Sequence, residues 1–384
     1  MSLLLLDFST KNPLAALLEG ARLVEMLPLD GSSRVGEVRA GVIKTVLRGQ
    51  ALFIDIGLEK NAYLDLSDPR ERRLVQNPSG LMPGKPLTVQ VLKDPHGDKG
   101  AAVTSELSFS GARLVLVGAP GGAAVSRRVE DPAERARLKE IGGRLLPPGF
   151  GLIMRTGCAG APEAAIAAEL HALASLAARV RERAVYSAPP CAVWSEAPEA
   201  RVLKDLAAEG IEKVIVSGRD SLTGLTELAE SLGLAGLAFE PYPGSIPIFD
   251  AYGVNKQAAE ALQTKVWLDC GGYITVEQTQ ACAVIDVNAG KYVSAKDRER
   301  AAAKVNAQAA AEAARQLRLR NLSGIIIIDF INQQSAEATA ALCEALRREL
   351  ARDRASAVMV GMTALSLMQI TRKKTGPALA EFFH

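Results

Sequence analysis

The chain has 384 residues, enough for two to four domains or subdomains, and 45 Lys and Arg nearly balance 43 Asp and Glu, so net charge alone does not indicate a nucleic-acid partner. No stretch approaches the roughly 20 apolar residues of a membrane span, and the apolar run within residues 1–7 is too short for a signal peptide. The five cysteines form no Cys-x-x-Cys pair, which disfavours a zinc site and fits reduced thiols. We therefore expect a soluble cytoplasmic protein.

Segment 35–107 has the pattern of a small all-β domain. Short alternating apolar and polar runs, separated by Pro and Gly, predict strands at 37–46, 51–56, 62–66, 87–92 and 101–107. Five strands in so short a segment suit an OB-fold barrel, a common platform for single-stranded nucleic acid. Phe53 and Tyr63 fall on adjacent predicted strands, where they either stack on bases or belong to the barrel core.

A mixed α/β pattern follows from residue 113. We predict strands at 114–117, 151–155 and 213–217, helices at 132–141 and 162–183, and a linker or domain edge at 187–198. Arg155 and Thr156 follow a predicted strand directly, so a guanidinium and a hydroxyl lie at a sheet edge. Such a pair can hold a phosphate through charge-assisted hydrogen bonds, and the alternative is a surface arginine without a partner.

Two aspartates lie at the ends of strongly apolar strands. Asp286 ends the run Ala-Cys-Ala-Val-Ile-Asp, and Asp329 follows four consecutive isoleucines, which predict a strand buried on both faces. An Ala- and Arg-rich helix is predicted between them at 297–320, ended by Asn-Leu-Ser-Gly. The order strand, helix, strand favours two parallel neighbours whose aspartates meet at one carboxyl edge.

Two carboxylates side by side repel each other, and burial removes their hydration. A divalent cation resolves both problems, and oxygen ligands favour Mg²⁺ or Mn²⁺ over zinc. Asn288, two residues beyond Asp286, projects toward the same face by the alternation of a strand. The alternative for each of these residues is a strand-end cap or turn.

The segments around Asp286 and Asp329 resemble the catalytic domain of the ribonuclease E/G family. The resemblance is carried by Gly-Gly-Tyr-Ile-Thr-Val-Glu-Gln-Thr at 271–279 with Val-Ile-Asp-Val-Asn at 284–288, and by Ala-Ala-Arg-Gln-Leu-Arg-Leu-Arg-Asn-Leu-Ser-Gly at 313–324 with Ile-Ile-Asp-Phe at 327–330. Motifs at 36–43, 53–57, 126–130 and 151–157 also fit, so the resemblance covers nearly the whole chain.

The resemblance implies an α/β protein of several subdomains. An RNase H-like subdomain is expected from 1–34 and 201–261, with an OB-fold RNA-binding domain at 35–107 inserted in it. A 5′-sensor subdomain is expected at 108–200 and a DNase I-like α/β catalytic domain at 262–384.

It also implies an Mg²⁺-dependent, single-strand-specific endoribonuclease of RNA processing and decay, whose products carry 5′-phosphate and 3′-hydroxyl ends. In that reading Asp286 and Asp329 hold the metal, and Asn288 is the third catalytic residue. The residues that correspond to RNA-holding positions of the family are Phe53, Tyr63 and Lys99. Those that correspond to the pocket for a 5′-monophosphate are Gly111, Val115, Arg155, Thr156 and Arg372.

The chain departs from the family's larger members at one place. Those members carry a Cys-Pro-x-Cys motif after the catalytic domain, through which two chains share a zinc ion, and this sequence has none. A homo-oligomer formed through a shared zinc is therefore not expected, and other oligomers stay open. Two alternative functions also stay open: a non-catalytic RNA-binding protein, and another metal-dependent phosphodiesterase or DNase.

Overall fold

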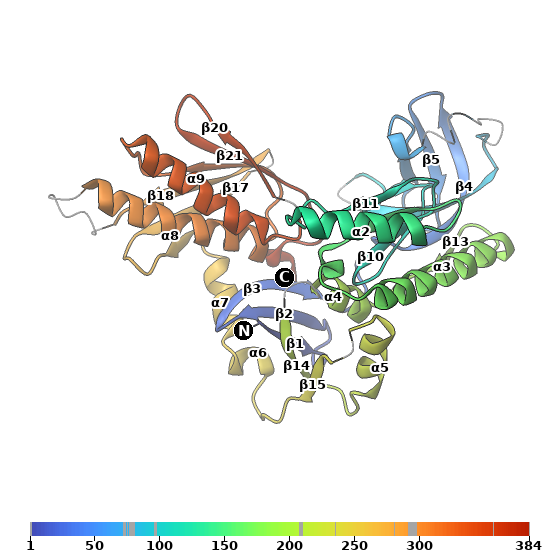
Figure 1. Ribbon diagram of the computed structural model, residues 1–384, viewed down its shortest axis with the longest axis horizontal. Helices are drawn as coiled ribbons and strands as arrows, with labels where there is room; N and C mark the ends of the chain where they lie inside the picture. Colours follow the sequence, from blue (N-terminus) through green and yellow to red (C-terminus); the bar gives the residue numbers. More distant parts are fainter. Residues whose placement is uncertain are drawn as a thin grey trace. The chain divides into compact units, whose positions relative to one another are not determined.

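The computed structural model divides the chain into two compact units, each built from segments that are distant in sequence (Figure 1). One unit comprises Met1–Leu27, Glu212–Asp220 and Ala238–His384, and the other comprises Pro28–Ile211 and Ser221–Leu237. The residues that the structure describes are 2–71, 74, 76, 81–95, 98–206, 210–234, 236–279, 281–290, 298–355 and 357–383.

The first sheet joins the N-terminal strands to strands from the middle of the chain. Its order is β15-β14-β1-β2-β3, with β1 and β2 antiparallel and β14 and β15 parallel. The strands are β1 (Ser2–Asp7), β2 (Leu14–Glu19), β3 (Arg22–Pro28), β14 (Ile211–Ser217) and β15 (Ala238–Pro241). Short helices α6 (Ile248–Ala251) and α7 (Val254–Ala261) bury apolar side chains in the same core. Segments on either side of the barrel in sequence thus share one sheet.

Five strands close into an OB-like barrel, as the sequence predicts. They are β4 (Val38–Leu47), β5 (Ala51–Asp55), β6 (Ala62–Asp65), β7 (Pro86–Lys93) and β8 (Ala102–Thr104). The barrel closes because β4 pairs with β5 along one edge and with β7 along the other. Leu52, Ile54 and Leu64 are fully buried inside it, which matches the inward half of the predicted alternation.

The stretch 187–198, predicted as a linker or domain edge, contains a strand. Residues Cys191–Trp194 form β13, which pairs antiparallel with β4 and extends the barrel sheet. The linker prediction was wrong because two prolines and a serine dominate the composition just before it. Residues 38–40 of β4 lie beyond the part that pairs with β5, and their free edge supplies the hydrogen bonds that make these few residues a strand.

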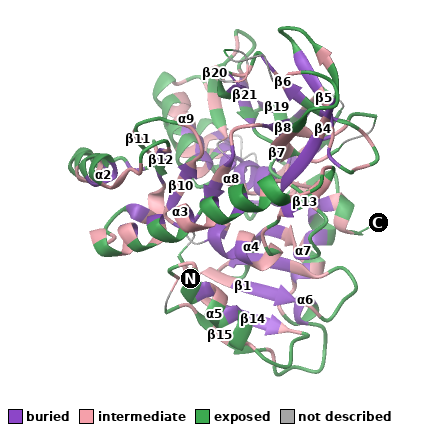
Figure 2. Ribbon diagram, turned by 90° about the vertical axis from the view of Figure 1, so that its right-hand side faces the viewer, coloured by how far each residue is buried: buried purple, intermediate pink, exposed green. Residues whose placement is uncertain are grey.

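The third sheet, of order β11-β12-β10-β9, is covered by two helices. Its strands are β9 (Ser108–Ser110), β10 (Leu114–Val117), β11 (Ala123–Val125) and β12 (Gly151–Met154), and its helices are α2 (Pro132–Leu145) and α3 (Glu163–Tyr186). The predicted elements are confirmed with shifts of a few residues. Much of α2 is exposed, as the green of its ribbon indicates (Figure 2). Two shorter helices of the same unit are α4 (Pro198–Leu206) and α5 (Thr223–Ser231).

The fourth sheet has six strands in the order β16-β17-β18-β19-β21-β20. They are β16 (Lys265–Trp267), β17 (Tyr273–Gln278), β18 (Cys282–Asn288), β19 (Gly324–Asp329), β20 (Val358–Met362) and β21 (Leu367–Arg372). The helices α8 (Arg298–Leu319) and α9 (Ala336–Ala351) lie together against one face (Figure 1). The predicted parallel pairing of β18 and β19 is confirmed. Asp297, where the sequence places the start of the helix, lies outside the described residues.

The isoleucine strand is buried on one face only, contrary to the prediction. Ile326 and Ile328 are fully buried under the helices, whereas Ile325 is 53% exposed on the opposite face. Both helices pack on the same side of the sheet, so the other face of β16 to β21 is open to solvent. Asp286 and Asp329 lie on this open face.

The arginines at the end of α8 hold the first unit together internally. Arg318 is buried and forms ion pairs with Glu19 and Glu25, over 3.3 and 3.4 Å. Arg315 donates to the carbonyl of Leu23 over 2.6 Å. These side chains tie α8 to the N-terminal sheet.

None of the helices in the described ranges combines the length and the apolar character that crossing a bilayer requires. All five cysteines are free thiols. Burial raises the pKa of the Cys158 thiol to about 12, so this residue is a packing element rather than a nucleophile.

Candidate active site

Asp286 and Asp329 lie directly beside each other on the open face of the six-stranded sheet. They are partners in the parallel pairing of β18 with β19, so their Cα atoms are separated by about one strand spacing, roughly 4.8 Å. Their sequence neighbours Ile285 and Ile328 point into the core beneath α8 and α9. The strand alternation therefore directs both carboxylates away from the core. Their meeting at one carboxyl edge of the sheet confirms the sequence prediction.

Asn288 completes the cluster. Its side-chain amide donates a hydrogen bond to Oδ2 of Asp286 over 2.5 Å, which confirms that the two side chains share a face. The backbone here is tightly packed, since a Cβ on Gly272 would lie 2.8 Å from the carbonyl oxygen of Asn288. The Gly-Gly pair just before β17 thus lets the chain approach Asn288 closely.

The two carboxylates are exposed, contrary to the expectation that they are buried in strands. Solvent therefore offsets part of their repulsion. Within the described part of the chain neither of them has an ion-pair partner, and no group of three or more His, Cys, Asp or Glu side chains is arranged to hold a metal. Two adjacent hard oxygen donors still fit Mg²⁺, which commonly binds through one or two carboxylates and keeps several waters.

A positioning residue that sequence reasoning missed is Asn306, in the middle of α8. It is fully buried, donates to the carbonyl of Ile331 over 2.7 Å and accepts from the amide of Ile331 over 3.0 Å. This double hydrogen bond fixes the backbone two residues beyond Asp329. A buried asparagine in an otherwise Ala-rich helical face was the signal that could have revealed it.

Phe53 and Tyr63 form an aromatic pair on the barrel. They face each other across β5 and β6, with ring centroids 5.8 Å apart and planes at 66°. Tyr63 is 40% exposed and Phe53 is half-buried, so the rings lie at the surface rather than in the barrel core. Lys99 is exposed, three residues before Ala102, which pairs with Tyr63. All three residues therefore belong to one region of the barrel.

Four of the five residues predicted for the 5′-phosphate pocket lie in the third sheet or in the turns beside its strands. Arg155 donates from Nη1 to the carbonyl of Gly111 over 2.7 Å and lies 3.9 Å from Asp205. Thr156 begins the turn directly after it. Val115 on β10 pairs with Ile153 on β12. Ile153 lies two positions before Arg155, so by the alternation of a strand both point to the same face. The Arg155 side chain is 29% exposed, so part of its guanidinium faces solvent.

Glu169 on α3 shapes this region and was not predicted. Its Oε1 accepts from the amides of Arg113 and Leu114, over 2.8 and 2.9 Å. A Cβ on Gly111 would lie 2.1 Å from the same oxygen, so a larger residue there would have to displace this carboxylate. The turn between β9 and β10 is therefore held by a carboxylate from the helix beneath it.

Arg372 lies in the other compact unit and is engaged inside it. Its guanidinium donates from Nε to Asp353 over 2.6 Å and from Nη1 to Asn321 and the carbonyl of Leu322, over 2.7 and 2.9 Å. The side chains of Arg372 and Asp353 are each 2% exposed. A guanidinium so enclosed offers no free edge to a phosphate, so of the predicted pocket residues Arg155 and Thr156 stay available to one.

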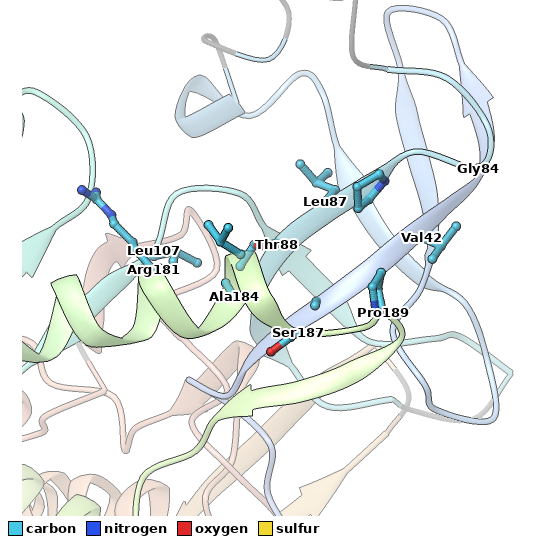
Figure 3. A pocket seen from close by; sticks show the side chains of 12 residues that line it. Val42, Gly84, Leu87, Thr88, Leu107, Arg181, Ala184, Ser187 and Pro189 are labelled. Atoms are coloured by element: carbon cyan, nitrogen blue, oxygen red, sulfur yellow. The ribbon is translucent and has the colours of Figure 1, made fainter.

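The barrel unit also has an open hollow of about 550 Å³ where β4, β7 and the end of α3 meet (Figure 3). Its lining is mainly apolar, including Val42, Leu87 and Ala184. The guanidinium of Arg181, at its rim, donates to the carbonyl of Gly118 over 3.2 Å and lies 4.7 Å from the ring centroid of Phe150. Arg181 is the one charged residue among the described residues of this lining, and its guanidinium is engaged by Gly118 and Phe150. The hollow is therefore not a candidate catalytic site.

Comparison with known proteins agrees with this geometry. Residues 108–375 match the family model described as the ribonuclease E/G family. The chain belongs to this family. It is 34% identical to ribonuclease E of Synechocystis sp., over 97% of the chain, and 35% identical to ribonuclease G of Escherichia coli K12, over 89% of the chain.

The ribonuclease E/G match includes the aspartate pair, Asn288 and Arg155. The barrel residues Phe53 and Tyr63 precede the matched range. The chain spans 57% of the length of the Synechocystis ribonuclease E and 73% of the length of the Escherichia coli ribonuclease G.

Proposed function

We propose that this ribonuclease E/G family member is an endoribonuclease that cuts single-stranded RNA with the help of Mg²⁺ or Mn²⁺. The observation that carries the proposal is the direct pairing of Asp286 with Asp329 on an open sheet face, beside Asn288. The exposed aromatic pair Phe53 and Tyr63 supports single-stranded RNA as the substrate, because stacking on rings tolerates any base.

The chemistry is hydrolysis of a phosphodiester bond. Asp286 and Asp329 would hold the metal ion, which when bound lowers the pKa of a coordinated water and offsets charge on the phosphate. Asn288 orients the Asp286 carboxylate through its amide. The water gives up a proton as its oxygen bonds to phosphorus, the bond from phosphorus to the 3′ oxygen breaks, and that oxygen takes up a proton. The products carry 5′-phosphate and 3′-hydroxyl ends.

The finer architecture belongs to the same proposal. The sheet of β1, β2, β3, β14 and β15 is then RNase H-like, and the six-stranded sheet with α8 and α9 is DNase I-like. The protein then works in the cytoplasm, with which its five free thiols are compatible. Its task there is RNA processing and decay, including that of ribosomal RNA.

A cleavage assay tests the proposal. A 5′-monophosphorylated single-stranded RNA is incubated with the protein, with Mg²⁺ and with a chelator, and the product ends are mapped. We expect internal cuts in Mg²⁺ only. RNA that is bound but never cut would favour a non-catalytic RNA-binding protein, and equal cutting of single-stranded DNA would favour a broader phosphodiesterase.

Replacing both Phe53 and Tyr63 by alanine is expected to weaken single-stranded RNA binding by at least about tenfold, because stacking contributes about 1–3 kcal/mol per base. Fluorescence anisotropy of a labelled oligonucleotide measures the affinity. Leu47→Ala, an exposed apolar residue of the same barrel, is the control and should bind RNA normally. Loss of the native circular dichroism spectrum in the double variant would instead assign the rings a role in folding.

The state of the RNA 5′ end is expected to affect the rate. A monophosphate can accept charge-assisted hydrogen bonds from Arg155, a hydroxyl offers no charge, and a triphosphate is too bulky for a fitted pocket. Cleavage of the monophosphorylated substrate should be at least about tenfold faster, since a hydrogen bond to a charged group contributes about 1.5–3 kcal/mol. Rates for three oligonucleotides that differ only at the 5′ end give the comparison.

Arg155→Ala should remove this preference and spare the basal rate, because Arg155 and the aspartates belong to separate compact units. Arg144→Ala, a surface arginine paired with Glu163, is the matched control and should keep the preference. Equal rates for all three 5′ ends with the parent protein would eliminate the sensor from this account.

A further inference from the structure

An aromatic and cationic cluster lies at one edge of the six-stranded sheet. Trp267 on β16 and Tyr273 on β17 are strand partners, with ring centroids 5.3 Å apart and planes at 64°. The ammonium of Lys265 lies 4.0 Å from the centroid of Trp267 and 3.6 Å from that of Tyr273. A lysine held against two rings by cation–π attraction is a specific arrangement rather than a scatter of surface residues.

The cluster is on the open face of the sheet. Val266, between Lys265 and Trp267, packs against the core beneath the helices, so its two neighbours point the other way. Trp267 is 64% exposed, although tryptophan is usually largely buried. An isolated exposed ring requires no explanation, but this one lies beside a second ring, a cation and the candidate active site.

The strand register connects the cluster to the aspartates. One row across β16, β17 and β18 consists of Trp267, Tyr273 and Asn288. The next row continues into β19 and consists of Lys265, Thr275, Asp286 and Asp329. At about 4.8 Å per strand, the Trp267 backbone lies about 10 Å from that of Asn288 on the same face.

Charge on this face favours a polyanion at the cluster. Among the described strand residues that point to the open face, Lys265 is the one with a positive charge, while Glu277, Asp286 and Asp329 are negative. An RNA strand held only at the carboxylates would be repelled by them. Lys265 offers a cation to the backbone phosphate next to the scissile one, and the rings offer a surface to its base.

We propose that Lys265, Trp267 and Tyr273 form a nucleotide-binding subsite for single-stranded RNA next to the cleavage site. A base of a flanking nucleotide stacks on the exposed face of Trp267, and Lys265 contacts the adjoining phosphate. This inference rests on the proposed function and adds to it a residue set that positions the strand at the aspartates. The subsite accepts any base, since stacking reads no hydrogen-bonding edge.

Fluorescence tests the subsite without any catalytic turnover. The chain has two tryptophans, and Trp194 is half-buried against Phe109, so Trp194→Phe leaves Trp267 as the one indole. Titration of this variant with single-stranded RNA in a chelator should quench its emission in parallel with binding measured by anisotropy. Binding without quenching overturns the proposal. A change that follows protein concentration rather than RNA would make this face a contact between copies and also overturn it.

Kinetics provide the second readout. Trp267→Ala should raise KM at least about fivefold, the equivalent of stacking one base, with kcat changed little. Trp267→Phe should largely restore KM, and Tyr186→Ala, an exposed aromatic at the end of α3, should leave it unchanged. A set of oligonucleotides is then compared in which each lacks one base near the cut. For one of them KM should rise as much as it does for Trp267→Ala, and combining that oligonucleotide with the variant should raise KM no further.

These outcomes separate the subsite from the proposed function. If the parent protein cuts RNA and Trp267→Ala has an unchanged KM, the subsite is wrong and the function stands. If no protein cuts RNA, the function fails, and the fluorescence titration still decides whether the cluster binds RNA.

Discussion

Replacing Asp286 or Asp329 by asparagine is expected to lower kcat for RNA cleavage by at least about 100-fold, the usual effect of removing a group that stabilises charge in the transition state. The reason is that the two carboxylates are adjacent strand partners and would hold the same metal ion, so loss of either charge removes half of its protein ligands. Both side chains are exposed, so the fold and the RNA affinity should change little.

Glu277→Gln is the matched control for these variants. Glu277 lies on the same open face, opposite Val284, but it has no carboxylate partner in its row. It should cleave RNA at the parent rate. Single-turnover rates in saturating Mg²⁺, with anisotropy for binding and circular dichroism for folding, distinguish the effects. Near-parental cleavage by either asparagine variant would remove the aspartate pair as the catalytic centre.

Arg372→Ala is expected to lower the free energy of unfolding by about 3–5 kcal/mol, the usual cost of removing one partner from a buried ion pair. The substitution leaves the Asp353 carboxylate buried without its guanidinium and removes donors to Asn321 and Leu322. Denaturant unfolding followed by Trp267 fluorescence, in the Trp194→Phe background, reports on the unit that contains Arg372.

Lys373→Ala, at the exposed neighbouring position, should change that free energy by less than about 0.5 kcal/mol. A combined Arg372→Met and Asp353→Leu variant should recover much of the lost stability, because it removes both buried charges. The opposite result, a stable Arg372→Ala protein that loses the preference for a 5′-monophosphate, would return Arg372 to the phosphate pocket.

Local patterns determined much of this fold. Alternating apolar residues located the barrel strands, because a strand exposes every second side chain, and the Asn-Leu-Ser-Gly segment marked the end of α8, where Asn321 takes the left-handed backbone conformation with φ of 52°. The strand–helix–strand order around Asp286 and Asp329 also predicted their parallel pairing. These features depend on short-range geometry, which the sequence carries directly.

Burial and partners depended on the tertiary structure. Four isoleucines predicted a strand covered on both faces, but α8 and α9 occupy the same side, and nothing local to the strand specifies that choice. For the same reason the aspartates are exposed. Cys191–Trp194 became a strand because residues 38–40 of β4 have a free edge. Those residues lie about 150 positions earlier in the chain, so the local sequence does not announce them.

The role of each charged side chain was the least accessible property. Arg372 ends β21 and Arg155 directly follows β12, yet Arg372 is enclosed by Asp353 and Asn321 while Arg155 keeps part of its guanidinium in solvent. A sequence states which charges and rings exist, whereas long-range packing decides which of them meet, because those contacts join residues whose separation along the chain carries no local signal.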